Sequence, residues 1–194
     1  MPLDFEPDSK FQYSNAGFNT VARIVEVVAG TAFEQFVGER LFQPLGMTDT
    51  TFWPSNEQLA RLAKSYKAGA DNQGLEETVI DQLHYPLTDR VERFPMPAGG
   101  LFSTAHDLAR FYQMLLNGGQ LDGRCYLSEA AVKTMTSRWT PAELQENYGF
   151  GFWLNDDSFG HGGSYWTNTI AYSKHGLVLV WLAQHASFPG NGGE

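Results

Sequence analysis

The chain has 194 residues, of which 42% are hydrophobic and 18% are charged, a composition typical of a globular domain rather than a disordered chain. Its 13 basic and 22 acidic residues give a net charge of −9. This balance argues against nucleic acid as a partner, because a phosphate backbone is bound through clustered Lys and Arg. A chain of this size buries roughly 70% of its unfolded surface, which is enough for a self-sufficient core.

The sequence offers little material for a cofactor or a membrane anchor. Cys125 is the single cysteine, so an internal disulfide is excluded, and we expect a buried structural thiol. No metal or other cofactor is expected, since four histidines show no ligand spacing: they are His84, His106, His175 and His185. The sequence has no signal-peptide pattern and no apolar run long enough to span a membrane, and the localisation stays unknown.

The first half of the chain predicts two helices. Apolar residues recur at helical spacing over 15–28, and Gly30 follows as a stop. Thr31 and Glu34 match a capping box that would open a second helix. That helix is predicted to end at Pro44 and Gly46.

A polar, irregular stretch separates these helices from the next one. Residues 62–92 predict short strands and loops. Thr104 and Asp107 are predicted to cap a helix that Gly118 and Gly119 end. Its apolar face would comprise Leu108, Phe111, Tyr112 and Leu115. A further short helix is expected over 128–137.

The hydrophobic period then changes from 3.6 to 2. Three antiparallel strands are predicted over 148–154, 164–173 and 177–184, separated by turns at 156–157 and 174–176. The last strand is apolar on both faces, as in a central strand. Helices followed by a strand meander indicate the α+β class.

Two short motifs could bear chemistry. Tyr13 and Asn15 lie two residues apart just before the first helix, where a rigid element would support their side chains. His161 is followed by Gly162, Gly163 and Ser164, at the predicted start of the second strand. Glycines there would let a ligand approach the backbone, whose N–H groups could stabilise an oxyanion.

These motifs resemble the serine β-lactamase and penicillin-binding protein superfamily, most closely its class C β-lactamase and esterase-like branch. The second family motif, Tyr-x-Asn, is similar to Tyr13 and Asn15, and the third is similar to His161-Gly162-Gly163. Two longer segments, FQYSNAGFNTVARIVE and PAGGLFSTAHDLARF, also look like segments of that family. The resemblance spans nearly the whole chain.

The resemblance implies roles for these residues. Tyr13 would take or relay the proton of a nucleophilic serine, and Asn15 would hydrogen-bond the substrate amide or a catalytic lysine. His161 would supply a donor near the leaving group or carboxylate, and the N–H of Ser164 would form part of an oxyanion hole with Gly162 and Gly163 beside it. A phenol with a pKa of about 10 needs a neighbouring cation to act as a base.

The family's nucleophile motif, Ser-x-x-Lys, supplies that cation, and it is absent from this sequence. The chain has five lysines, and none has a serine three places before it. Neither Ser14 nor Ser164 has an apparent base to make it a replacement nucleophile. The family also ends in a helix after its last strand, which we expect to be absent or cut to a stub here.

The resemblance therefore implies one incomplete β-lactamase/transpeptidase-like domain over 1–194, shortened at both ends. It would be mainly helical over about 13–140, with an irregular insert at 62–94, and would form antiparallel strands over about 148–184. An apolar strand left uncovered would favour self-association, giving a homo-oligomer through the exposed sheet.

Three functions remain open. The first is a hydrolase of β-lactams, peptidoglycan peptides or small esters, acting through an acyl-enzyme and inactive as this chain alone. The second is a non-catalytic module that binds a small molecule in the retained cleft. The third is a truncated gene product without a function of its own.

Overall fold

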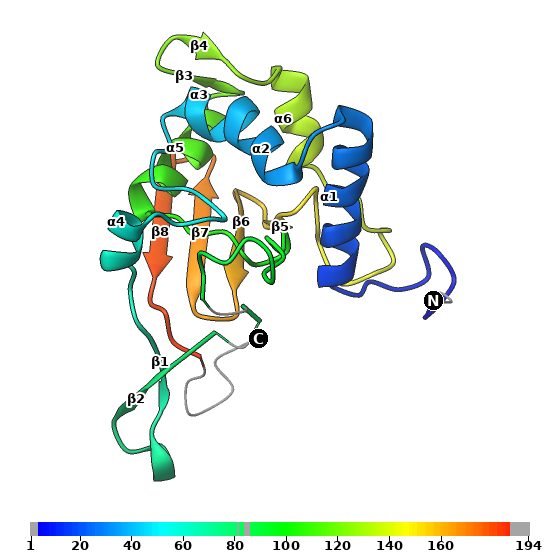
Figure 1. Cartoon of the computed structure of the whole chain (residues 1–194). Helices are drawn as coiled ribbons and strands as arrows, with labels where there is room; N and C mark the ends of the chain where they lie inside the picture. The colour runs from blue at the N-terminus through cyan, green and yellow to red at the C-terminus, as the bar shows by residue number, and fades with distance from the viewer. Residues whose placement is uncertain (1–3, 81, 84–85, 187–194) are drawn as a thin grey trace. The chain divides into compact units, whose positions relative to one another are not determined.

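The computed structural model describes residues 4–80, 82–83 and 86–186, which form two compact units. Figure 1 labels their helices and strands along the chain. Of the described residues, the first unit comprises 4–14, 109–161 and 169–179, and the second comprises 15–80, 82–83, 86–108, 162–168 and 180–186. His84, the last residues of the chain and the expected C-terminal stub lie outside the described residues.

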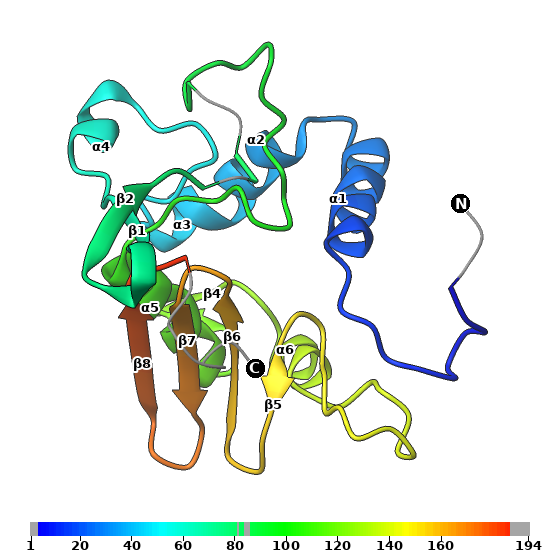
Figure 2. The same ribbon diagram turned by 90° about the horizontal axis from the view of Figure 1, so that it is seen from below.

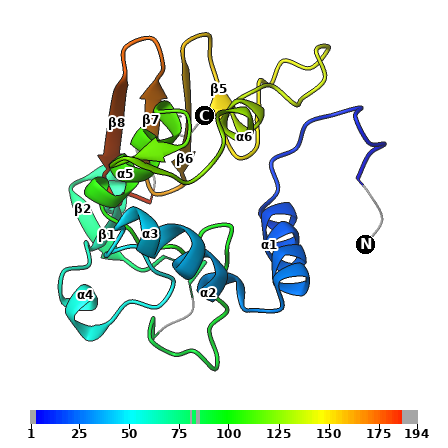
Figure 3. The same ribbon diagram turned by 90° about the horizontal axis from the view of Figure 1, so that it is seen from above.

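The second unit begins with the helices that the sequence predicts. Helix α1 covers Asn15–Ala29, and Gly30 ends it in the left-handed region at φ 68°. Helix α2 (Phe33–Val37) continues into a π-helical turn and then into helix α3 (Gln43–Leu45), as the trace in Figure 3 shows. Gly46, also at φ 68°, ends this series. Both glycine stops are confirmed.

Two details of these helices differ from the prediction. The capping box at Thr31 and Glu34 is wrong, because α2 starts after Ala32 and has no side-chain cap. The Phe33 N–H donates instead to Oε1 of Glu26 on α1, at 3.0 Å. Pro44 does not end the helix but lies in the first turn of α3, where a residue without an N–H is tolerated.

A buried arginine organises the loops of the second unit. Arg93 is 3% exposed, and its guanidinium donates to the carbonyl oxygens of Phe52 at 2.7 Å, Leu87 at 3.0 Å and Gly100 at 3.3 Å. The same cation lies 4.9 Å from the ring centroid of Trp53. Carbonyl oxygens and a ring face thus compensate for the lost hydration of this charge.

Helix α4 (Asn56–Ala60) has a complete capping box on Ser55 and lies just before the irregular stretch. In the described part of 62–92, the chain forms short strands and loops as predicted. Strand β1 (Ser65–Ala68) then pairs antiparallel with strand β2 (Leu75–Thr78), as Figure 1 shows.

Helix α5 covers Ala105–Leu116 and passes from the second unit into the first. Thr104 caps it as predicted, since its Oγ1 accepts from the Asp107 N–H at 3.2 Å. The predicted capping role of the Asp107 side chain is wrong. That carboxylate is 2% exposed and accepts from the Asp49 N–H and the Thr50 hydroxyl, at 2.9 and 2.8 Å.

The first unit packs around the second half of α5. Tyr112 contacts Phe152 and Phe159, with ring centroids 5.9 and 6.1 Å away. Strands β3 (Gln120–Leu121) and β4 (Arg124–Cys125) follow. Helix α6 (Glu129–Met135) then forms where a short helix is expected, and Ser128 caps it. The prediction of a buried Cys125 is wrong, because β4 is a two-residue strand at the surface and leaves this thiol exposed.

The last strands of the described chain form a four-stranded antiparallel sheet in the order β5-β6-β7-β8. Figure 2 shows neighbouring strands running in opposite directions. The strands are β5 (Trp153–Leu154), β6 (Ser158–Gly163), β7 (Thr167–Tyr172) and β8 (Leu177–Leu182). The sequence predicts only three, and it places His161 before the second strand rather than inside β6. The sequence SFGHGG hides β6, because glycine has low strand propensity.

Helices combined with separate antiparallel sheets confirm the α+β class. In the described ranges no helix is long and apolar enough to cross a membrane. The expected exposure of the last strand is confirmed, since the alternating side chains of β8 are half exposed or more: Leu177, Leu179 and Trp181. However, β8 lies at the edge of the described sheet, not at its centre.

Gly160 is predicted to be essential for the pairing of β6 with β7. A Cβ at Gly160 would lie 2.2 Å from the Thr169 carbonyl oxygen, whereas one at Gly162 would find its nearest neighbour at 3.5 Å. Gly160→Ala should therefore lower the free energy of unfolding by about 3 kcal/mol, a typical cost of overpacking. Gly162→Ala is the matched control and should change it by less than about 1 kcal/mol. Equal urea midpoints for the two variants would contradict this account.

We predict that β8 drives self-association. An edge strand with exposed apolar residues is a template for pairing with another chain. Light scattering should show a mean mass that rises with protein concentration, and Trp181→Lys should reduce it. A monomer at every concentration would contradict this prediction.

Candidate active site

The structure brings Tyr13 and His161 together, although they lie near opposite ends of the sequence. Their ring centroids are 5.6 Å apart and the rings are tilted by 41°. Tyr13 is the second-last residue of the segment that leads into α1, and His161 lies in β6 within the same unit. Tyr13 is 43% exposed, so a small molecule could reach its ring, whereas His161 is half-buried and its Nε2 atom is buried.

Two further tyrosines surround His161. The Tyr148 ring meets the imidazole edge-on, with centroids 5.9 Å apart and an interplanar angle of 82°. The Tyr112 hydroxyl accepts a hydrogen bond from the backbone N–H of His161. The imidazole is thus held between two phenol rings while a third phenol fixes its backbone. We call Tyr13, Tyr112, Tyr148 and His161 the phenol cluster.

All three phenols stay protonated at neutral pH. Burial raises the pKa of Tyr112 to about 12. Burial and the neighbouring phenols of Tyr13 and Tyr112 raise the pKa of Tyr148, and burial raises the pKa of Tyr13. A nearby cation would lower these pKa values, yet none of the groups that shift them is a cation.

The other predicted site residues belong to the second unit. Asn15 is the first residue of α1. Gly162 and Gly163 end β6, Ser164 follows them, and all three are exposed. Packing alone requires glycine at position 163, since a Cβ on Gly163 would lie 2.4 Å from Thr167 Oγ1.

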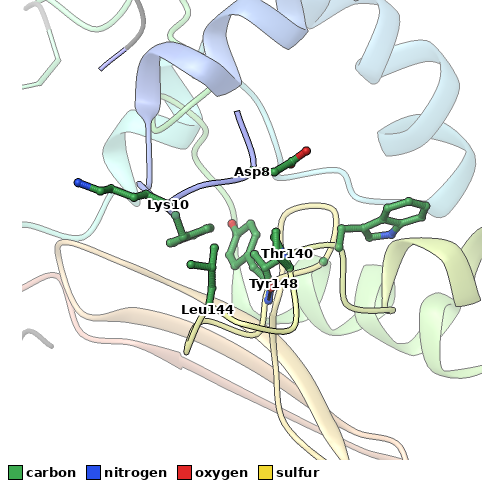
Figure 4. Close-up of a pocket in the computed structure, with 9 residues that line it drawn as sticks. Asp8, Lys10, Thr140, Leu144 and Tyr148 are labelled. Carbon is green, nitrogen blue, oxygen red and sulfur yellow. Dashed lines mark hydrogen bonds between the residues drawn. The ribbon is translucent and has the colours of Figure 1, made fainter. Parts of the chain in front are cut away.

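A hollow of about 220 Å³ lies beside the phenol cluster in the first unit. Its lining comprises Asp8, Lys10, Phe11, Trp139, Thr140, Pro141, Leu144, Tyr148 and Gly149. Figure 4 shows Tyr148 between the segment with Asp8 and Lys10 and the loop with Thr140 and Leu144. Neither Tyr13 nor His161 lines this hollow, so Tyr148 is the member of the cluster that connects the two places.

The short motifs of the sequence point to Tyr13 and His161 but not to Tyr112 or Tyr148. The sequence places Tyr112 on the apolar face of a helix, and it is indeed buried there. It places Tyr148 at the start of a strand. A possible signal was the polar hydroxyl on each of these otherwise apolar residues, because a buried phenol normally has a hydrogen-bond partner.

The phenol cluster has chemistry for binding and proton relay. Neutral phenols and an imidazole both donate and accept hydrogen bonds, so they can bind a polar ligand and pass a proton between them. Within residues 4–80, 82–83 and 86–186, no group of three or more His, Cys, Asp and Glu side chains could hold a metal ion. The cluster alone contains no activated nucleophile.

Comparisons with known proteins place this arrangement in a family. The Beta-lactamase family profile matches residues 1–193. Protein Rv1367c of Mycobacterium tuberculosis is 31% identical over 211 residues, covering 95% of this chain and 51% of that protein. A putative D-alanyl-D-alanine carboxypeptidase of Escherichia coli O157:H7 is 27% identical, covering 97% of this chain and 48% of that protein. The chain thus spans about half the length of these curated relatives.

Solved structures share the fold. A penicillin-binding protein from Bacillus halodurans matches with a TM-score of 0.72 at 23% identity, over 96% of this chain and 55% of that one. A mutant simvastatin synthase from Aspergillus terreus matches with a TM-score of 0.79 at 21% identity, over 98% and 53% of the two chains. Together with the family profile over nearly every residue, these matches establish that the chain belongs to the β-lactamase family.

Proposed function

We propose that this chain contributes the tyrosine and histidine part of a serine hydrolase site that works through an acyl-enzyme. The contact between Tyr13 and His161 is the observation that supports this proposal most strongly. In the proposed site, Tyr13 relays the proton of a serine, and His161 donates near the leaving group. Asn15 binds the substrate amide, and Ser164 offers its backbone N–H beside Gly162 and Gly163.

The serine and its lysine must come from outside this sequence. No Ser-x-x-Lys occurs in the 194 residues. Burial raises the pKa of Tyr13, and a protonated phenol is a poor base at pH 7, so Tyr13 would need a neighbouring cation to act as one. A lysine brought next to Tyr13 would lower its pKa and complete the catalytic group. We therefore propose that the chain alone is inactive.

The proposed function allows several classes of substrate. A protein named as a putative D-alanyl-D-alanine carboxypeptidase and a penicillin-binding protein are among the relatives, and EstCE1, a hydrolase with promiscuous acyltransferase activity, is among the solved structures with this fold. These names support β-lactams, peptidoglycan peptides and small esters as candidates. A histidine rather than a lysine in the third motif favours the esterase or peptidase-like members.

A second candidate is a non-catalytic module that binds a small molecule reversibly. The cluster of Tyr13, Tyr148 and His161 favours it, because these side chains can bind a ligand without a nucleophile. This candidate predicts binding of a β-lactam or an acylated dipeptide without turnover. The absence of any heat in calorimetry would count against it.

The chain should form no covalent adduct with active-site probes. After incubation with benzylpenicillin or a fluorophosphonate at pH 7, intact mass spectrometry should show the unmodified mass. The physical reason is that no Ser-x-x-Lys motif occurs in the sequence to supply an activating lysine. An adduct on Ser14 or Ser164 would overturn the proposed inactivity, whereas an adduct on Cys125 would report only its exposed thiol.

Stability should fall at high pH because of Tyr112. Its pKa is about 10 in the unfolded chain and about 12 in the folded one, so its contribution is fully present below pH 10. Between pH 10 and 12 the unfolded chain loses a proton that the folded chain keeps, and stability decreases. Tyr112→Phe should make the decline shallower by about 1.4 kcal/mol per pH unit. Identical pH slopes in urea unfolding of the variant and the wild type would contradict this.

A further inference from the structure

Tyr148 differs from the other tyrosines of the phenol cluster in its hydrogen bonding. It is 8% exposed, and its hydroxyl oxygen is fully buried. Within the part of the chain that the structure describes, this hydroxyl has no hydrogen-bond partner. Buried polar groups nearly always have one, so an unpartnered phenol next to a candidate site calls for an explanation.

The surroundings of Tyr148 are aromatic. Its ring contacts Phe11, Trp153 and His161, with centroids 5.3, 4.8 and 5.9 Å away. A leucine or phenylalanine would fill such a place without leaving a polar atom unpaired. The hydroxyl therefore adds nothing to the packing of the free chain, and its use must lie in a bound state.

An incoming molecule could gain access to this hydroxyl by moving side chains alone. Tyr13 and Trp153 are 43% and 39% exposed. Tyr13 interacts electrostatically with Tyr148, and the Trp153 ring packs against it. Exposed side chains change rotamer on the picosecond to nanosecond timescale. A ligand that seats against Tyr13 and His161 would displace these rings rather than the backbone.

The Tyr148 hydroxyl and the charges around it define the kind of ligand that could bind there. A protonated phenol donates one hydrogen bond, and an ester or amide carbonyl oxygen accepts one. A buried carboxylate would need a cation beside it, and no cation is among the groups that shift the pKa values of the three phenols. Lys10 lines the neighbouring hollow, but Figure 4 shows its side chain extending away from Tyr148.

We propose that Tyr148 is a substrate-binding residue whose hydroxyl donates to the carbonyl oxygen of a neutral ester or amide lying against Tyr13 and His161. In this chain, without the lysine of the proposed complete site, these residues then select neutral acyl compounds over free carboxylates. This inference rests on the proposed function and narrows its substrate class.

The test uses benzamide as a neutral carbonyl probe and benzoate as its anionic counterpart. The chain is labelled with ¹³C at the Cζ atoms of its eight tyrosines, and each probe is titrated while NMR spectra are recorded. We expect benzamide to shift the Tyr148 and Tyr13 signals along one binding curve. Benzoate should bind at least about tenfold more weakly, since it would bury a charge without a cation.

Tyr148→Phe identifies the Tyr148 signal and measures the hydrogen bond. It should weaken benzamide binding by about threefold to tenfold, as expected for one neutral hydrogen bond. Its Tm should equal or exceed that of the wild type, because the hydroxyl has no partner in the free chain. Tyr172→Phe, on β7 of the same unit, is the matched control and should leave benzamide binding unchanged.

The outcomes separate this inference from the proposed function. A benzamide shift at Tyr13 without one at Tyr148 would overturn the role of Tyr148 alone. Equal affinity of Tyr148→Phe, tighter binding of benzoate, or a lower Tm of Tyr148→Phe would also overturn it. If benzamide shifted neither tyrosine, the site itself, and with it the proposed function, would be contradicted.

Discussion

The contact between the Tyr13 and His161 rings is the interaction on which the candidate site depends. It joins a segment that leads into α1 to a strand near the end of the described chain. Two constraints hold His161 in place: the close approach of Gly160 to the Thr169 carbonyl, and the hydrogen bond from the His161 N–H to the Tyr112 hydroxyl. The site is thus positioned by backbone geometry before any ligand binds.

The same cluster agrees with the proposal that the chain needs a further group to be a catalyst. Burial keeps the phenols neutral, and neutral phenols bind and relay protons but do not abstract them efficiently. A lysine would change this balance, because a cation beside a phenol lowers its pKa. The sequence lacks Ser-x-x-Lys, and burial raises the pKa of Tyr13. Both observations agree with the proposal that a lysine from another polypeptide segment must lie beside Tyr13.

The sequence predicted the elements whose signals are local. Helical spacing and the stops at Gly30 and Gly46 located the first helices, and Thr104 and Ser128 marked two later starts. The sequence did not predict the features that depend on contacts between residues far apart in the chain. Strand β6 forms despite its glycine-rich sequence, and the close approach of β7 explains why residue 160 is glycine. The Asp107 side chain accepts a hydrogen bond from a distant loop rather than capping its own helix.

The site was predictable in part for the same reason. Tyr13 and His161 belong to short motifs that can be read locally, whereas Tyr112 and Tyr148 reach the cluster only through folding. The familiar segment from Pro97 to Phe111 also has a structural use, since it contains Thr104 and the buried Asp107 that fix α5 and the loop at Asp49. A family motif therefore indicates a place in the fold as often as a step in the chemistry.

The most direct test of this account supplies the serine and lysine in trans. The chain would be mixed with a family polypeptide that contains Ser-x-x-Lys, and hydrolysis of a chromogenic ester would be measured. The account predicts a rate above the sum of the separate polypeptides, which Tyr13→Phe abolishes. Hydrolysis by this chain alone, a rate unaffected by Tyr13→Phe, or no gain when the two polypeptides co-elute would contradict it.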